Sequence, residues 1–275
     1  MPELPEVETI VRGLQSIVNS SIVHIDTSAS KGLIKSGTEE GFKITLLDSQ
    51  VKLIRRFGKW IRFDCQLGDD HPVLLSHLGM FGAWLKGGAL GPHARLTLDL
   101  DGPQGGTRLT YSDMRSWGRL YAFTKPEADK FMEGRVGIDA LDVTQSHLEL
   151  MLRAYTGPVV EFLLDQGRLA GIGNIYRSEI LHQASIAPDR PCTDLDNAEV
   201  LRLSDSIRQV LLDAIERRGS SISDYVDADG NKGSAHLYLK AYGREGEPCT
   251  TCRSDLIRLS KDFDRTVYFC PKCQH

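Results

Sequence analysis

The first residues of the chain carry groups that are suited to covalent chemistry. Pro2 follows Met1 directly, and Glu3 comes next. Once Met1 is removed, the nitrogen of Pro2 is a secondary α-amine, and α-amines titrate at about pH 8, roughly two units below a lysine side chain. Such an amine can attack an electrophilic carbon and give a charged iminium, while the carboxylate of Glu3 transfers protons. The alternative is a proline-stiffened chain start that leads into a helix.

Four cysteines toward the C-terminal end are spaced for a metal ion. Cys249 and Cys252 form one Cys-x-x-Cys pair, Cys270 and Cys273 form another, and 17 residues separate the pairs. Four thiolates match the closed, tetrahedral coordination of structural zinc. We therefore expect one structural Zn2+ and no catalytic metal. Two unrelated thiol pairs are the alternative.

Two further segments could bind phosphate. Residues 171–174 read Gly-Ile-Gly-Asn before a predicted helix, and small residues at a helix start let backbone N–H groups approach an anion. Lys59 follows Gly58 within residues 51–63, a strand-like stretch that contains five Lys or Arg residues and no acid. A simple tight turn and a solvated strand lysine are the corresponding alternatives.

Taken together, these motifs resemble the bacterial formamidopyrimidine-DNA glycosylase family, which also includes endonuclease VIII. The resemblance rests on four segments in the same order: PELPE at residues 2–6, RRFGK at 55–59, GIGNIY at 171–176 and the cysteine pairs. It extends over the whole chain. It implies a bifunctional base-excision repair enzyme that acts on damaged double-stranded DNA and removes oxidised purines such as 8-oxoguanine and formamidopyrimidines.

The resemblance also implies a mechanism. Pro2 would attack C1′ of the damaged nucleotide and form a Schiff base, with Glu3 as general acid and base and Glu6 in support. The strand would then be cut by β- and δ-elimination. Lys59 and Arg265 would belong to the catalytic residues because they would bind the phosphates beside the lesion. Zinc would order the hairpin that carries Arg265.

Other residues are implied to contact DNA. Residues 76–82 resemble a segment whose methionine, here Met80, fills the space left by an extruded base, and residues 113–118 resemble a loop whose arginine and aromatic side chain, here Arg115 and Trp117, occupy the same gap. Residues 219–225 resemble a loop that closes over an extruded purine. The remaining expected DNA contacts are His77, His93, Asn174, Tyr242 and Arg244.

The chain departs from the family pattern at several of these positions. Val160 stands where a lysine is usual, Phe81 replaces a small hydroxyl residue, and the loop at 113–118 reads DMRSWG, with Met114, Ser116 and Trp117 substituted. An unmet hydrogen bond costs about 1–3 kcal/mol. Because Val160 lacks a cationic donor, we expect 8-oxoguanine to be handled less well than formamidopyrimidines. Substrate preference should change, and the reaction type should not.

The bulk composition narrows the class of protein. The 275 residues carry a formal net charge of −4, so DNA binding would require a local basic face such as residues 51–63. There is no apolar run of membrane-spanning length, and residues 1–20 contain Glu3, Glu6 and Glu8 in place of a basic and then apolar signal pattern. We therefore expect a cytosolic protein with no membrane partner. We also expect a monomer.

Periodicity predicts the elements that must position these groups. Apolar residues at helical spacing over residues 7–18 predict an amphipathic helix after the N-terminus. Short strand-like runs follow between residues 22 and 123, at 22–25, 44–47, 73–75, 95–100 and 109–111. Beyond residue 126 the pattern becomes helical, with a capping-box signature at Ser146, a helix start at Pro158, a helix over 174–182 and a long helix over 200–215 that ends at Gly219.

The predicted fold is α+β with two domains. Residues 1–133 are expected to form an N-terminal antiparallel β-sandwich with a flanking helix, residues 134–230 a helix–two-turn–helix domain, and residues 236–275 a four-cysteine zinc finger. Two other functions remain open at this point: an endonuclease VIII-type enzyme for oxidised pyrimidines, and a non-catalytic zinc protein that binds damaged DNA. The sequence PELPE argues against the first, and Pro2 with Glu3 argues against the second.

Overall fold

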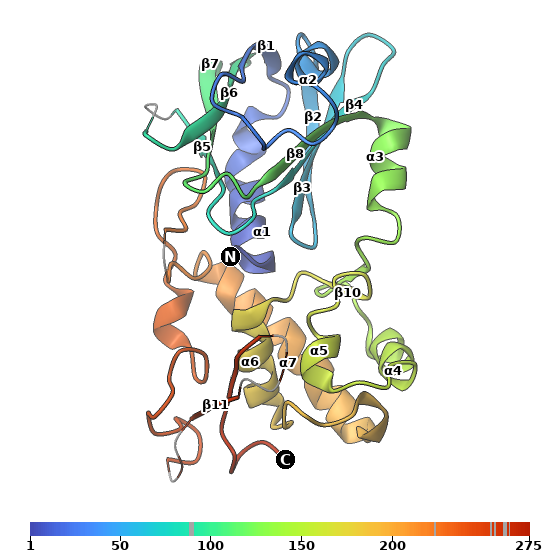
Figure 1. Ribbon diagram of the computed structural model, residues 1–275, viewed down its shortest axis with the longest axis vertical. Helices are drawn as coiled ribbons and strands as arrows, with labels where there is room; N and C mark the ends of the chain where they lie inside the picture. The colour runs from blue at the N-terminus through green and yellow to red at the C-terminus, as the bar shows by residue number, and fades with distance from the viewer. Residues whose placement is uncertain (88–90, 223, 254, 256, 261–262, 264) are drawn as a thin grey trace. The chain divides into compact units, whose positions relative to one another are not determined.

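The computed structural model describes residues 1–87, 91–222, 224–253, 255, 257–260, 263 and 265–275. The chain folds as two units (Figure 1). The first unit comprises Met1–Glu133 and Arg217–Ser234, and the second comprises Gly134–Glu216 and Ala235–His275. The segment Arg217–Ser234 therefore packs with the N-terminal part of the chain although it follows the long helix in sequence.

The first unit is built on one eight-stranded sheet in the order β5-β7-β6-β1-β2-β3-β4-β8, and every pairing in it is antiparallel. This confirms the predicted antiparallel architecture. The strands are β1 (Ser21–Asp26), β2 (Gln50–Phe57), β3 (Trp60–Gln66), β4 (Pro72–His77), β5 (Ala83–Lys86), β6 (Ala94–Gly102), β7 (Gly105–Ser112) and β8 (Arg119–Thr124).

One apolar core joins this sheet to the first helix. Inward-facing side chains of the strands pack with Val7, Ile10 and Leu14, and Ala228 joins the same cluster. A second, smaller cluster lies under α3 (Lys125–Met132) and includes Val73, Leu75 and Ala128. Burial of this apolar surface is what holds the sheet and its helices together.

The N-terminal helix begins earlier and ends earlier than its periodicity predicts. Helix α1 spans Leu4–Gly13, with Pro5 in its first turn, and the 3-10 helix η1 (Leu14–Ile17) continues it. A capping box between Glu3 and Glu6 satisfies N–H groups of the first turn. Gly13 permits close packing, because a Cβ atom there would lie 2.9 Å from the Cβ of Ala228.

The strand predicted at residues 44–47 is wrong. These residues lie in and just after helix α2 (Glu39–Leu46), whose N-cap Thr38 accepts a hydrogen bond from the backbone N–H of Gly41 at 3.0 Å. Two acidic residues in the first turn favour the helix further. The cap and the helix dipole therefore outweigh the short apolar run.

The second unit is mainly helical. Its elements are β9 (Ile138–Asp139), α4 (Gln145–Arg153), α5 (Val159–Phe162), β10 (Leu169–Ala170), α6 (Asn174–Ala184), η2 (Cys192–Asp194), α7 (Asn197–Glu216), η3 (Ala235–Tyr238), β11 (Arg258–Ser260) and β12 (Val267–Phe269). Strands β9 and β10 pair in parallel, and β11 and β12 form an antiparallel hairpin. Helix α4 is capped by Thr144 and not by Ser146, because the hydroxyl of Thr144 accepts from the N–H of His147.

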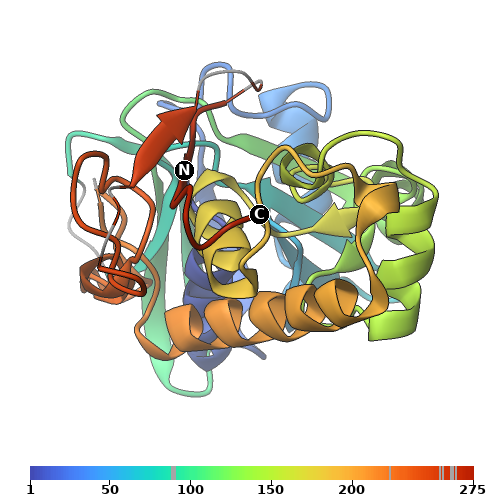
Figure 2. The ribbon, with the colours of Figure 1, turned by 90° about the horizontal axis from the view of Figure 1, so that it is seen from below.

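Helix α6 is buried on almost every side, since nine of its eleven residues are buried. It packs across α7, as Figure 2 shows, and it also contacts β12. A helix that is enclosed in this way shows little amphipathic pattern, so its polar residues must find partners inside the protein. Three of those polar residues are described with the site below.

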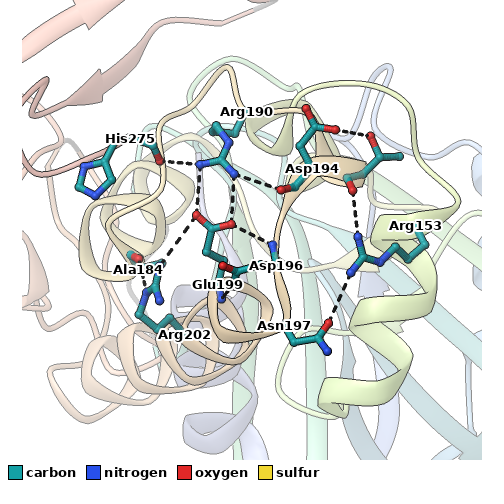
Figure 3. A network of polar contacts seen from close by, with 10 residues as sticks. Arg153, Ala184, Arg190, Asp194, Asp196, Asn197, Glu199, Arg202 and His275 are labelled. Carbon is teal, nitrogen blue, oxygen red and sulfur yellow. Dashed lines mark hydrogen bonds and ion pairs between the residues drawn. The ribbon is translucent and has the colours of Figure 1, made fainter.

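The start of α7 is held by a network of polar contacts (Figure 3). Asp196 and Glu199 form reciprocal hydrogen bonds between backbone N–H and carboxylate, at 2.7 and 2.9 Å. Glu199 also makes two 3.1 Å contacts with the guanidinium of Arg190, which donates to the backbone carbonyls of Asp194 and His275 as well. This network ties the C-terminal residue to the body of the second unit.

No helix among the described residues is long and apolar enough to cross a membrane.

Candidate functional site

The N-terminal residues are buried and held at the start of α1. Pro2 is buried, and Glu3 is only 2% exposed. Glu3 is the N-cap residue of α1, and its backbone N–H donates to Oε2 of Glu6 at 2.8 Å. A carboxylate at a helix N-terminus is stabilised by the helix dipole. The chain therefore holds Glu3 in one orientation beside Pro2.

Glu6 links the N-terminus to the segment around residue 220. Its second carboxylate oxygen, Oε1, accepts from the N–H of Ser220 at 2.7 Å, and its carbonyl accepts from the hydroxyl of Tyr225 at 3.2 Å. Gly219 passes so close that a Cβ atom there would lie 2.8 Å from Oε1. Glu6 thus fixes both Glu3 and the start of the segment that the resemblance implies to be a closing loop. Ser223 of that loop lies outside the described residues.

Lys59 directly precedes β3, and the first residue of that strand, Trp60, pairs with His77 at the end of β4. Lys59 is 6% exposed and follows a turn at Gly58 with a positive φ of 56°. Burial, together with the charges of Lys59 and Arg119, lowers the pKa of His77 to about 4. Its Nδ1 accepts from the N–H of Gly79 at 3.1 Å, so the neutral ring carries its proton on Nε2.

An exposed aromatic and cationic cluster forms at the two loops predicted to fill the gap in DNA. The guanidinium of Arg115 lies 4.8 Å from the ring centre of Phe81 and 5.0 Å from that of Trp117. Met80 and Trp117 are 41% and 50% exposed. The predicted residues are therefore brought together, and Phe81, which departs from the family pattern, packs against the arginine.

Buried hydrogen bonds hold this loop in place. The carboxylate of Asp113 is fully buried and accepts from the N–H groups of Arg115 and Gly118 at 3.0 and 2.7 Å. His93, an exposed side chain, is attached nearby, because its carbonyl accepts from the N–H of Asp113 at 2.9 Å. The exposure of the side chains at 115 and 117 thus rests on a backbone that is fixed by buried contacts.

In the second unit, Asn174 is the first residue of α6 and follows the N-cap Gly173. Arg265 is exposed and lies just before β12. The side chain of Arg177 contacts both positions: it donates to Oδ1 of Asn174 at 2.8 Å and to the carbonyl of Arg265 at 2.7 Å. The two predicted phosphate ligands are therefore connected through a buried residue that sequence reasoning missed.

A buried carboxylate positions the backbone that leads to the predicted contacts at 242 and 244. Glu179, 7% exposed, accepts from three consecutive backbone N–H groups, those of Lys240, Ala241 and Tyr242, at 2.8 to 2.9 Å. Arg244 forms an ion pair with Glu247 at 2.8 Å. Sequence reasoning missed Glu179 as well. The signal that could have found it is the run of three polar residues at 177–179, which stands between apolar residues of the predicted helix.

The four predicted metal ligands lie together. The Sγ atoms of Cys249, Cys252, Cys270 and Cys273 all fall within 4.8 Å of one another. The distance is 3.8 Å between Cys249 and Cys273 and 3.7 Å between Cys252 and Cys270. A tetrahedron with metal–sulfur bonds of about 2.3 Å has edges of about 3.8 Å. The two sulfur–sulfur distances match these edges, so the cluster could hold a metal ion of that size.

Hydrogen-bond donors surround these sulfurs. The N–H groups of Thr251 and Cys273 donate to Cys249 and Cys270, each at 3.4 Å, and Nε2 of His182 lies 3.3 Å from Cys249. Contacts of this kind orient metal ligands and offset their negative charge.

Comparison with known proteins places the chain in a family. The model for the formamidopyrimidine-DNA glycosylase N-terminal domain matches residues 1–120, and the model for the formamidopyrimidine-DNA glycosylase H2TH domain matches residues 137–226. Formamidopyrimidine-DNA glycosylase of Pelotomaculum thermopropionicum is 35% identical over 100% of this chain and 99% of its own length. That of Carboxydothermus hydrogenoformans is 36% identical over 100% of both.

Solved structures agree with this assignment. A complex between Lactococcus lactis Fpg and an abasic site containing DNA has a TM-score of 0.87 and 32% identity, covering 99% of both chains. A complex between a mutant of the same protein and a Fapy-dG containing DNA has a TM-score of 0.88 and 32% identity, covering 100% of both chains. These findings confirm the resemblance inferred from the motifs. The chain belongs to the formamidopyrimidine-DNA glycosylase family.

Proposed function

We propose that this protein is a bifunctional DNA glycosylase and AP lyase of base excision repair, which removes oxidised purines such as 8-oxoguanine and formamidopyrimidines from double-stranded DNA. The observation that carries the proposal is the buried start of α1, where Glu6 holds the backbone of Glu3 beside Pro2. Full-length relatives named as formamidopyrimidine-DNA glycosylases support the same reaction class.

In the proposed reaction, the nitrogen of Pro2 bonds to C1′ of the damaged nucleotide while the bond from C1′ to the base breaks. The base leaves with the bonding electrons and takes up a proton. Glu3 serves as the general acid and base in opening the sugar, which leaves an iminium at C1′. The iminium acidifies C2′, so loss of that proton expels the 3′ phosphate, and a second elimination expels the 5′ phosphate.

Glu6 supports this chemistry without reacting itself. Both of its carboxylate oxygens accept backbone N–H groups, one from Glu3 and one from Ser220. A reacting group must be held close to its productive geometry, because small displacements cost large factors in rate. We therefore assign Glu6 the role of fixing Glu3 and, through it, Pro2.

We assign the DNA contacts to side chains of both units. Lys59, Asn174 and Arg265 are proposed to hold phosphates beside the lesion, since cations and helix N-termini are the usual partners of phosphate. Met80, Arg115 and Trp117 are proposed to fill the space that the extruded base leaves, because flat and long side chains offset the cost of unstacking. His77, His93, Tyr242 and Arg244 complete the proposed set.

One structural zinc ion is proposed at the four cysteines. The sulfur spacing fits zinc–thiolate bonds, and Nε2 of His182 lies where it can donate to the thiolate of Cys249. A closed site of four thiolates has no open coordination position, so the metal would order the hairpin β11–β12 and take no part in the reaction. We further propose that the protein is a monomer. We also propose that it works in a reducing compartment, which is consistent with the free, buried thiols of Cys65 and Cys192.

Borohydride trapping tests this proposal. Reduction of the iminium should give a stable protein–DNA adduct on duplexes with an abasic site, 8-oxoguanine or a formamidopyrimidine, and the mature protein should lack Met1 by intact mass. Pro2→Gly should reduce adduct formation far more than DNA binding. Binding without any adduct would instead support the non-catalytic damage-binding protein, and adducts only on oxidised pyrimidines would support the endonuclease VIII-type enzyme.

A further inference from the structure

A buried arginine in α6 connects two surface positions of the second unit. Arg177 is 0% exposed. Its Nη2 donates to Oδ1 of Asn174 at 2.8 Å and to the carbonyls of Arg265 and Thr266 at 2.7 and 3.3 Å, and its Nη1 donates to the carbonyl of Val160 at 3.2 Å. A buried guanidinium is costly unless its donors find acceptors, and these four contacts of Nη1 and Nη2 offset that cost.

The contact with Asn174 fixes the direction of the amide. An asparagine side chain has one accepting end and one donating end, whereas a guanidinium can only donate. Arg177 therefore binds Oδ1 and turns Nδ2 the other way. A phosphate oxygen only accepts hydrogen bonds, so the end turned away from Arg177 is the end that phosphate needs. The amide lies at the N-terminus of an eleven-residue helix, where the dipole also favours an anion.

The contacts with the carbonyls of Arg265 and Thr266 fix a second element. Both residues come directly before β12, and the side chain of Arg265 is exposed. The adjacent Ser178 supports the same strand, because its hydroxyl accepts from the N–H of Tyr268 at 3.4 Å. The backbone that carries Arg265 is thereby set relative to the start of α6.

We infer that Arg177 is a positioning residue that holds Asn174 and Arg265 in register, so that both bind phosphates of one DNA strand. The inference rests on the proposed function, since it concerns how phosphate is held. Arg177 does not touch DNA itself, because it is fully buried. Its effect on DNA binding must therefore pass through the residues that it orients, and Asn174 and Arg265 are the two among them that we propose to bind phosphate.

Double-substitution cycles test this inference. The probe is a duplex with a stable tetrahydrofuran abasic-site analogue, and the readout is the dissociation constant over a range of salt concentrations. Asn174→Ala and Arg265→Ala should each weaken binding about tenfold, the loss of a typical hydrogen bond to a charged group. Arg177→Met should weaken it by more than either. Adding Asn174→Ala or Arg265→Ala to Arg177→Met should then change binding less than about threefold, because the two residues have already lost their orientation.

Salt dependence separates positioning from a general loss of structure. Arg177→Met should lower the log–log salt slope by roughly one unit, as Arg265→Ala does, because a cation leaves the phosphate backbone. Arg190→Met is the matched control: it also removes a guanidinium that binds two carbonyls in the second unit, and it should leave the slope unchanged (Figure 3). Where Arg177→Met does not fold, Arg177→Lys gives the same comparison, since one ammonium group does not reproduce the planar fork of donors.

Each outcome decides the question. Additive losses in both cycles, an unchanged slope in the Arg177 variants, equal effects of Arg177→Met and Arg190→Met, or full binding by Arg177→Lys would each overturn the inference. Failure of the wild-type protein to prefer the analogue over undamaged duplex would instead count against the proposed function. The two failures are therefore distinguishable.

Discussion

Substituting Gly219 by alanine should displace the group that holds the proposed catalytic residues. Gly219 has a φ of 77°, and a Cβ atom there would lie 2.8 Å from Oε1 and 2.9 Å from Cγ of Glu6. The left-handed backbone costs a non-glycine residue about 1–2 kcal/mol. Glu6 is 1% exposed and bound on both oxygens, so it cannot swing aside without losing a hydrogen bond to a charged group, worth about 1.5–3 kcal/mol.

Gly230→Ala provides the matched control for this substitution. Gly230 lies in the same segment with a φ of 81°, but no described atom lies within 4 Å of the position that its Cβ would take. The Gly230→Ala variant should therefore lose only the cost of placing alanine in a left-handed backbone, about 1–2 kcal/mol of unfolding free energy. Gly219→Ala should lose about 2.5–5 kcal/mol in total. The difference between the two variants isolates the displacement of Glu6.

Chemical denaturation and single-turnover trapping provide the measurements. If displaced Glu6 releases Glu3, the rate of adduct formation should fall at least about tenfold in Gly219→Ala, since misplacement of a reacting group by about 1 Å can cost a hundredfold. Gly230→Ala should keep the wild-type rate. Equal losses of stability in both variants, or a wild-type trapping rate in Gly219→Ala, would refute the reasoning.

Four further predictions concern the metal site, the surface cations, His77 and Val160. Chelation of the proposed zinc should disorder the C-terminal hairpin and abolish lesion binding, which circular dichroism and gel-shift titration would show; a metal-free preparation with full affinity would contradict it. Lys59→Ala and Arg265→Ala should each reduce the log–log salt slope of DNA binding by roughly one unit, and unchanged slopes in both would mean that neither cation touches the backbone. The pKa of His77 is lowered from 6.5 to about 4 in the folded protein, so between pH 4 and 6.5 the unfolded chain binds more protons than the folded one. The free energy of unfolding should therefore be unaffected by His77 above pH 6.5 and should fall as the pH drops from 6.5 toward 4. His77→Gln should flatten this pH dependence. Single-turnover excision should be slower for 8-oxoguanine than for formamidopyrimidines because Val160 lacks a cationic donor, and equal rates on the two lesions would contradict this. Because Val160 is 0% exposed and its carbonyl binds Arg177, Val160→Lys should destabilise the second unit.

Much of the fold follows from local patterns in the sequence. Alternating leucines at 96, 98 and 100 predict β6, the apolar spacing after residue 200 predicts α7, and the two Cys-x-x-Cys pairs predict the cysteine cluster. Prediction fails where a local cap decides between helix and strand. Thr38 caps α2 across a run that reads as a strand, and Thr144 caps α4 in place of Ser146.

Other features depend on contacts between distant residues, and local patterns do not reveal them. Ser220 binds Glu6 across 214 positions, which is why Arg217–Ser234 packs with the first unit. Arg177 binds the backbone at residue 265 across 88 positions. Sequence reasoning identifies the side chains proposed to face the ligand, because their chemistry is visible in their type. Among the residues that orient them, it identifies Glu6 but misses Arg177 and Glu179, whose polar groups find their partners inside the protein.

The discontinuous first unit has a consequence for how the protein matures. About a hundred residues separate Glu133 from Ser234. A ribosome adds roughly 5–20 residues per second, so for several seconds the nascent chain has residues 1–133 but lacks Ser220, whose N–H binds Glu6. In the finished fold Pro2 is buried. Removal of Met1, which the proposed role of Pro2 requires, would therefore occur most easily in that interval, before Ser220 fixes Glu6 at the start of α1.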